Sequence, residues 1–152
     1  GSGDPQSARK MEFSDLYSNR ILEIAGAARQ MPRLESPDAT ARKVSRVCGS
    51  VVEVDLEFDE GRVAAYGATI NACALGQTSA AIVAERIVGS TPAELRAVRD
   101  QMTAMLRADG PPPNGKWDDL KYLEPVRAFP ARHASTLLVF EAVVEALERA
   151  GA

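Results

Sequence analysis

Residues 51–70 read VVEVDLEFDEGRVAAYGATI, and the period of two in this stretch decides the fold. From Val52 to Phe58, apolar side chains alternate with acidic ones, which is typical of a half-buried strand. The turn signal Asp59-Glu60-Gly61 follows, and residues 62–70 are predicted to return as a partner strand. Upstream, residues 39–47 (ATARKVSRV) are interpreted as a third strand. The sequence therefore predicts a three-stranded antiparallel meander.

Helices are predicted on both sides of this meander. The first begins at Ser14 and ends before Pro32, with Tyr17, Ile21, Ile24 and Ala28 on one face. After the meander the period changes at Ala74, and a helix runs until Gly89. Three further segments are predicted: a helix from the capping box 91–94, a short helix over 117–123 before Pro125, and a last helix bearing Leu137, Phe140, Val144 and Leu147. The predicted fold class is α+β: an N-terminal helix, the meander, and a helical C-terminal half packed on one sheet face.

Composition narrows the possible functions. The chain has 152 residues, 45% hydrophobic and 26% charged, which suits one domain over residues 11–152. Gly1 to Lys10 is interpreted as an expression scar. A net charge of −3 without a broad basic field argues against a nucleic-acid partner. No run approaches the ~18 apolar residues of a membrane span, and no signal peptide is evident. With only two cysteines, a disulfide scaffold is not expected, and we expect a cytoplasmic protein.

Three potential soft ligands fall at junctions between predicted elements. Cys48 lies between the first two strands, Cys73 between the last strand and its helix, and His133 just ahead of the last helix. The spacing contains no CxxC pair, so it does not by itself indicate a metal site. Buried core cysteines and an isolated histidine are the ordinary alternative. The positive end of a helix dipole, however, favours thiolate, the form that binds metal or carries sulfur.

Several motifs together resemble a known family. These are LYSNRILEIA with MPRL, VCGS around Cys48, YGATINACALGQTSAAIVAERIVGST around Cys73, and VRAFPARHASTLL around His133. The chain resembles, over roughly Leu16 to Leu147, the U-type iron–sulfur cluster assembly scaffolds, which include IscU, SufU and the N-terminal domain of NifU. The resemblance implies the same α+β fold.

The resemblance also implies a ligand set. Cys48 falls on the family's first ligand cysteine, Cys73 on its second, and His133 on the His or Lys that precedes its third. The family's ligand aspartate is here Ser50, and its third cysteine is Ala134. The remaining residues, Cys48, Cys73 and His133, would bind Zn²⁺ as three ligands and leave its fourth position open. Two cysteines per subunit would also hold a [2Fe–2S] cluster across a homodimer, because such a cluster takes four thiolates.

Three functions follow from this resemblance. The first is a non-enzymatic scaffold or carrier that binds iron, an iron–sulfur cluster or zinc, with a cysteine desulfurase and cluster-recipient proteins as partners. The second is enzymatic: a zinc-supported sulfurtransferase partner of a cysteine desulfurase, in which Cys73 or Cys48 takes the persulfide. The third is a metal-free paralogue used for protein binding. Arg132 is a candidate to stabilise a thiolate or persulfide, and Ser50 to complete the site.

The predicted strand before Cys48 is basic, since it carries Arg42, Lys43 and Arg46. Two interpretations stay open. The side chains form either a docking patch for an acidic partner or a solvated strand face.

Overall fold

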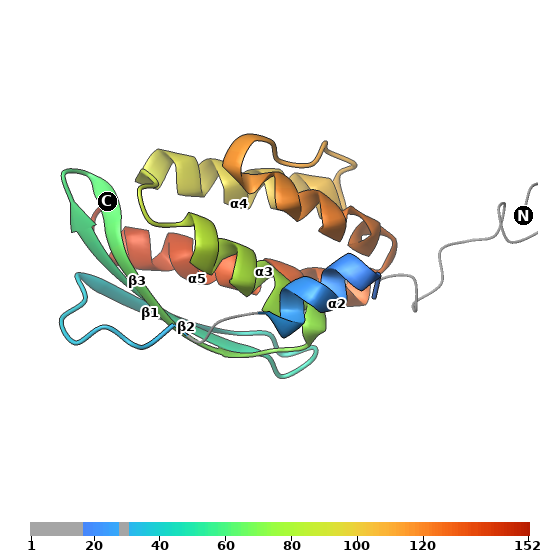
Figure 1. Cartoon of the computed structure of the whole chain (residues 1–152), viewed down its shortest axis with the longest axis horizontal. Helices are drawn as coiled ribbons and strands as arrows, with labels where there is room; N and C mark the ends of the chain where they lie inside the picture. Colours follow the sequence, from blue (N-terminus) through green and yellow to red (C-terminus); the bar gives the residue numbers. More distant parts are fainter. Residues whose placement is uncertain (1–16, 28–30) are drawn as a thin grey trace, which may run out of the picture.

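The structure is a computed structural model and describes residues 17–27 and 31–152 (Figure 1). Ser14, Ala28 and the interpreted expression scar lie outside these residues. In chain order the elements are α2 (Asn19–Gly26), β1 (Ala39–Val44), β2 (Val51–Asp59), β3 (Arg62–Asn71), α3 (Ala74–Arg86), α4 (Pro92–Arg107), the 3₁₀ helices η2 (Gly115–Ala128) and η3 (Pro130–Arg132), and α5 (His133–Arg149).

The sheet is the predicted antiparallel meander, with strand order β1-β2-β3. Val54 of β2 pairs with Ala41 of β1 on one side and with Ala68 of β3 on the other. β1 ends at Val44, three residues before the predicted end of this strand. The chain turns there because the Ser45 amide donates to the Ser50 carbonyl at 2.8 Å, which closes the β1–β2 loop. Cys48 therefore lies in a loop that starts earlier than expected.

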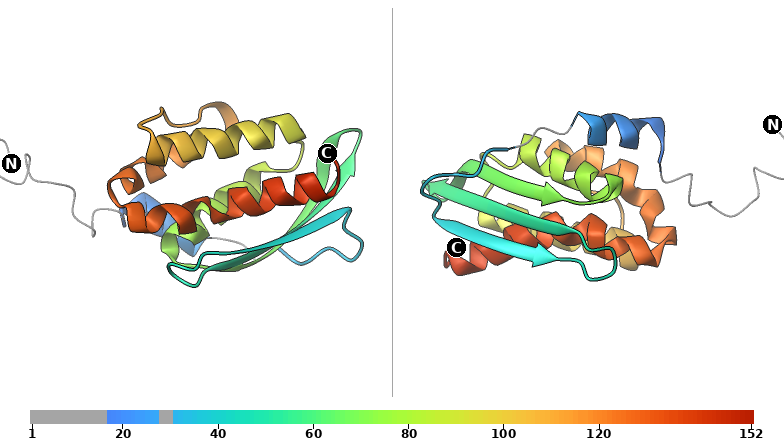
Figure 2. Two further views of the ribbon diagram at one scale, coloured as in Figure 1. Left: turned by 180° about the vertical axis from the view of Figure 1, so that it is seen from behind. Right: turned by 90° about the horizontal axis from the view of Figure 1, so that it is seen from below.

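All helices lie on one side of the sheet, as Figures 1 and 2 show. α5 packs against β1 and β2, α3 lies beside it, and α4 packs against α5. The core forms where the inward residues of the sheet, such as Val54 and Leu56, meet the apolar stripe of α5, including Leu137 and Leu147. The predicted α+β class is confirmed. No helix within the described residues is long and apolar enough to span a bilayer.

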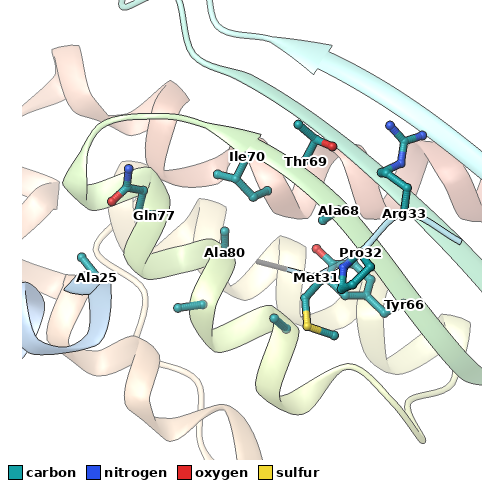
Figure 3. A pocket seen from close by; sticks show the side chains of 12 residues that line it. Ala25, Met31, Pro32, Arg33, Tyr66, Ala68, Thr69, Ile70, Gln77 and Ala80 are labelled. Atoms are coloured by element: carbon teal, nitrogen blue, oxygen red, sulfur yellow. The ribbon is translucent and has the colours of Figure 1, made fainter. Parts of the chain in front are cut away.

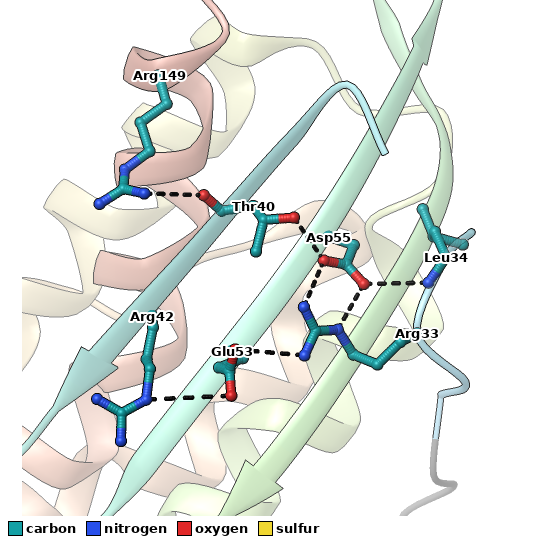
Figure 4. A network of polar contacts seen from close by, with 7 residues as sticks. All are labelled: Arg33, Leu34, Thr40, Arg42, Glu53, Asp55 and Arg149. Carbon is teal, nitrogen blue, oxygen red and sulfur yellow. Dashed lines mark hydrogen bonds and ion pairs between the residues drawn. The ribbon is translucent and has the colours of Figure 1, made fainter. Parts of the chain in front are cut away.

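Arg33 and Leu34, which precede β1, are held on the sheet by a buried carboxylate, that of Asp55 in β2 (Figure 4). The Arg33 guanidinium, the Leu34 amide and the Thr40 hydroxyl all donate to it, the last two at 3.0 and 2.7 Å. Burial of the Asp55 carboxylate works to raise its pKa, but these donors outweigh burial, so the pKa is lowered. Pro32 passes close to β3, which explains why position 67 is a glycine. A Cβ there would lie 2.5 Å from the Pro32 carbonyl oxygen.

The helix predicted over 117–123 is longer than expected and of a different type. It is the 3₁₀ helix η2, which continues through Pro125 to Ala128. Its buried residues recur every third position, at Trp117, Leu120, Leu123 and Val126. A 3₁₀ helix has three residues per turn, so this spacing places all four side chains on one face. The sequence carried a period of three, which a search for the α-helical period overlooks.

Candidate metal and sulfur site

Three chain junctions meet at one end of the sheet. The register pairs Val44 with Val51 and Val51 with Asn71, so β1 ends, β2 begins and β3 ends at the same edge. The β1–β2 loop places Cys48 there. Cys73 follows β3 and is the N-cap residue of α3.

Ser135, in the first turn of α5, links the two cysteines. Its hydroxyl oxygen lies 3.7 Å from the Cys73 sulfur and accepts a hydrogen bond from that thiol. The same hydroxyl also interacts with the Cys48 sulfur. The structure thus brings the side chains of Cys48 and Cys73 together around one buried serine.

The Cys48 sulfur is surrounded by serine hydroxyls and a backbone amide. Burial of its sulfur is the largest single influence and works to raise its pKa. The hydroxyls of Ser50, Ser45 and Ser135 and the Ser50 amide act in the opposite direction, and together they lower the pKa to about 7. The shortest of these contacts joins the Cys48 sulfur to the Ser50 hydroxyl at 2.9 Å. Cys48 is also exposed, so its thiolate is accessible at neutral pH.

His133 is the first residue of α5 and is buried. Its Nε2 atom lies 3.0 Å from the Val126 carbonyl oxygen and 3.2 Å from that of Arg127. Nε2 must carry a proton to donate to either oxygen, which leaves Nδ1 as the ring nitrogen that has a lone pair. Within residues 17–27 and 31–152, no three His, Cys, Asp or Glu side chains are grouped closely enough to hold a metal ion.

Arg132 contributes to the site through its main chain. Its carbonyl oxygen accepts hydrogen bonds from the hydroxyls of Ser135, at 3.2 Å, and Thr136, at 2.8 Å. The first of these bonds orients the Ser135 hydroxyl, whose oxygen accepts from the Cys73 thiol. A contribution of the guanidinium to thiolate stability stays a prediction.

The residues at the start of α5 face different surroundings. Ala134, which the family resemblance aligns with the third ligand cysteine, lines a groove beside Ser45 and Arg46. The next residue, Ser135, contacts both cysteines, because successive helical residues point about 100° apart. Sequence comparison alone missed Ser135. The only signal was a hydroxyl one position after the expected ligand.

This arrangement suits soft-metal or sulfur chemistry. Two thiols lie at one sheet end, one of them ionised near neutral pH, and thiolates are the preferred ligands of zinc and iron–sulfur clusters. Hydrogen bonds between the Cys48 sulfur and the neighbouring serine hydroxyls favour the thiolate form of this residue.

A cavity of about 520 Å³ lies away from the two cysteines, between β3, α3 and the segment around Met31 (Figure 3). Its lining is dominated by small apolar side chains and contains no cysteine, histidine or carboxylate. The Tyr66 hydroxyl beside it is sealed from solvent and has no hydrogen-bond partner among the described residues. Burial raises the pKa of this phenol far above its usual range, so it is not poised for proton transfer.

Comparison with known proteins places this geometry in context. No family model matches the chain. A nitrogen-fixing NifU-like protein (N-terminal) from Brucella abortus is 46% identical with a TM-score of 0.88, over 91% of this chain and 96% of that one. The IscU scaffold protein of Thermotoga maritima is 24% identical over 139 residues, which are 91% of this chain and 97% of the relative. The SufU protein of Fervidobacterium islandicum AW-1 shares the fold, with a TM-score of 0.81 at 19% identity over 90% of this chain and 99% of that one.

The fold is that of the U-type scaffolds. The chain belongs to the U-type iron–sulfur cluster assembly scaffold family, since a relative of this family at 46% identity matches nearly its whole length. The resemblance identified from the sequence motifs is thereby confirmed.

Proposed function

We propose that this protein is a scaffold or carrier in iron–sulfur cluster assembly, which receives iron, an iron–sulfur cluster or zinc at Cys48 and Cys73. The observation that supports this most is the convergence of both cysteines on Ser135 at one end of the sheet. The names of the relatives agree with it. A cysteine desulfurase and cluster-recipient proteins are the partners that such a role requires.

The residues present fit this cargo in part. Cys48 and Cys73 supply two thiolates. These two side chains and His133 are not grouped closely enough to hold an ion in the described structure. His133 is therefore proposed as a third ligand, through Nδ1, after a rearrangement that brings its ring to the sulfurs, since its Nε2 faces the η2 carbonyls. Ser50 lies close to Cys48, but a hydroxyl is a poor ligand unless deprotonated. Remaining positions are proposed to be taken by water or by a second chain.

A second candidate is sulfur transfer, which the exposure and the lowered pKa of Cys48 favour. The Cys48 thiolate would attack the terminal sulfur of a persulfide on a cysteine desulfurase. A new S–S bond forms on Cys48 as the donor's S–S bond breaks, and the donor cysteine leaves as a thiolate. A bound zinc ion would support this reaction by organising the site, as in a zinc-supported sulfurtransferase.

The metal and sulfide content of anaerobically purified protein separates these functions. Iron together with acid-labile sulfide supports the scaffold. One zinc per chain supports the sulfurtransferase, and neither metal supports a metal-free paralogue used for protein binding. Cys48→Ser and Cys73→Ser are each expected to lose the bound ions, with Ser36→Ala, an exposed site before β1, as the control. Full metal content in both cysteine variants would refute the proposed site.

A further inference from the structure

A groove of about 300 Å³ adjoins the Cys48 loop. It lies between this loop and the helices α4 and α5, and its floor includes the buried side chains of Leu137 and Leu138. The groove contains neither cysteine, so it is separate from the proposed ligand set. Because it shares the β1–β2 loop with Cys48, a molecule bound there would lie directly beside the reactive thiol.

Two cations of the groove are unpaired. Arg46 in the β1–β2 loop and Arg107 at the end of α4 are exposed, and neither has an ion pair or a hydrogen-bonded side chain within the described part of the chain. The other charged residues that line the groove form ion pairs. Lys43 lies 3.4 Å from Glu145, and Glu141 lies 3.8 Å from Arg99. Two free guanidiniums thus face one groove on a chain whose net charge is −3.

The rim of the groove is apolar. Val47 is 70% exposed and Val44 is 45% exposed, and together they make up half of the large exposed hydrophobic residues in the described chain. Both line the groove. Exposed aliphatic side chains around an apolar floor, with arginines beside them, are typical of a surface that another protein covers.

We propose that this groove docks an acidic segment of a partner protein, with an apolar side chain on the Leu137 and Leu138 floor and carboxylates on Arg46 and Arg107. A nucleic acid is disfavoured, because two free cations give a weak phosphate site and the net charge repels a polyanion. The proposal deepens the proposed function, on which it rests for the partner's purpose: the docked segment holds the partner's reactive group against Cys48. Of the three basic side chains before Cys48, Arg46 alone is used in this proposal, because Arg42 lies 4.0 Å from Glu53 and Lys43 lies 3.4 Å from Glu145.

The test is fluorescence anisotropy of the full chain with a short labelled peptide in which a leucine is flanked by glutamates. Arg46→Glu and Arg107→Glu are each expected to weaken binding about tenfold, the usual effect of losing a hydrogen bond to a charged group. Arg86→Glu makes the same charge change on the exposed far end of α3 and is expected to bind normally. Val47→Ser is expected to weaken binding while leaving the charge unchanged.

Three results would overturn the docking site. They are equal binding of the peptide with glutamines in place of glutamates, equal loss in the Arg86→Glu control, and tighter binding of a labelled oligothymidylate than of the peptide. Circular dichroism of each variant verifies folding. Binding by the metal-free Cys48→Ser, Cys73→Ser double variant is expected to equal that of the parent. Peptide binding by a chain that holds no metal or sulfide would therefore uphold the docking site and refute only the proposed metal function.

Discussion

Hydroxyl groups, rather than a positive charge, hold the Cys48 thiol ready for ionisation. Hydrogen bonds with the hydroxyls of Ser50, Ser45 and Ser135 and with the Ser50 amide outweigh the effect of burial and lower the pKa of this thiol. The family resemblance aligns Ser50 with the family's ligand aspartate. A carboxylate there would supply a hard ligand and repel the thiolate, whereas the hydroxyl stabilises it. Serine in place of aspartate at position 50 thus replaces a metal ligand with a hydroxyl that stabilises the Cys48 thiolate.

Ser50→Ala is expected to raise the pKa of Cys48 from about 7 toward the ~8.5 of a free thiol, because the shortest donor to its sulfur is removed. A higher pKa leaves less thiolate at neutral pH, so alkylation by iodoacetamide slows there and its pH midpoint moves upward. The rate is measured against pH in a Cys73→Ser background. Ser36→Ala, which removes an exposed hydroxyl elsewhere, keeps the parent midpoint. An unmoved midpoint in Ser50→Ala would mean that other groups set the pKa.

Gly67→Ala tests the close approach of Pro32 to β3. A methyl group at this position meets the Pro32 carbonyl oxygen at 2.5 Å, and backbone cannot move as a flexible side chain does. We expect a loss of about 1–3 kcal/mol in the free energy of unfolding, measured by denaturant titration. Gly26→Ala in α2 has nothing within 4 Å of the added methyl and is expected to be neutral or slightly stabilising. Equal stability of the two variants would show that the backbone at Pro32 moves away from position 67 at little cost in free energy.

At the scale of elements, the rotation of α5 decides which side chain completes the site. Position 135 contacts both cysteines, and position 134 lines the neighbouring groove. We therefore expect Ser135→Cys to tighten zinc binding more than Ala134→Cys. A four-ligand zinc site contributes ~10–16 kcal/mol, so one added thiolate is expected to gain on the order of a hundredfold in affinity.

The measurement is a competition titration with a zinc chelator on both variants and the parent. The gain from Ser135→Cys should increase with pH through the thiol range, since each added thiol releases its proton on binding. Ser135→Ala serves as the control for loss of the hydroxyl. A larger gain from Ala134→Cys would contradict the geometry and support the alignment by family resemblance.

Asp55 ties another pair of elements together, since it joins β2 to the segment before β1. Asp55→Asn is expected to cost about 2–3 kcal/mol at neutral pH, less than the ~3–5 of a fully buried pair because Arg33 is 39% exposed. The pKa of Asp55 is lowered on folding, so its stabilisation is complete above the carboxyl's ordinary pKa and disappears as the pH falls through the lowered value. The difference in the free energy of unfolding between the parent and Asp55→Asn should therefore disappear at acid pH. Glu57→Gln, a half-buried neighbour on β2, should show no such difference in denaturant titrations at either pH.

Much of this architecture was predictable because its local signals agree. The alternation over β2 and the Asp59-Glu60-Gly61 turn predicted the meander, and Thr91 caps α4 through the Glu94 amide as its capping box indicated. A helix was predicted at η2, but its length and its 3₁₀ type were not, because a period of three lies close to the α-helical one. The contact of Ser135 with both sulfurs was not predictable, since the rotation of α5 is set by packing against β1 and β2.

At the scale of the whole molecule, the helices leave the reactive end of the sheet accessible. All of them pack on one face, so the β1–β2 loop projects at the edge with Cys48 and Val47 exposed. A second chain or a partner protein can therefore approach the site without moving any described helix. The same exposure means that ligands missing from one chain can come from another.

Two chains of this protein are consequently expected to form a dimer when they bind a [2Fe–2S] cluster. Each chain has only two cysteines, and the cluster takes four thiolates, so two chains must share it. Light scattering after anaerobic size exclusion, in buffer free of thiols, should show the mass double on loading with iron and sulfide, at one cluster per two chains. Chelation of the iron should restore the starting mass. Cys73→Ser should lose both cluster and dimer, whereas Arg86→Glu should lose neither. A fully loaded chain that keeps its starting mass would contradict cluster sharing, and would require His133 or a hydroxyl to replace two thiolates within one subunit.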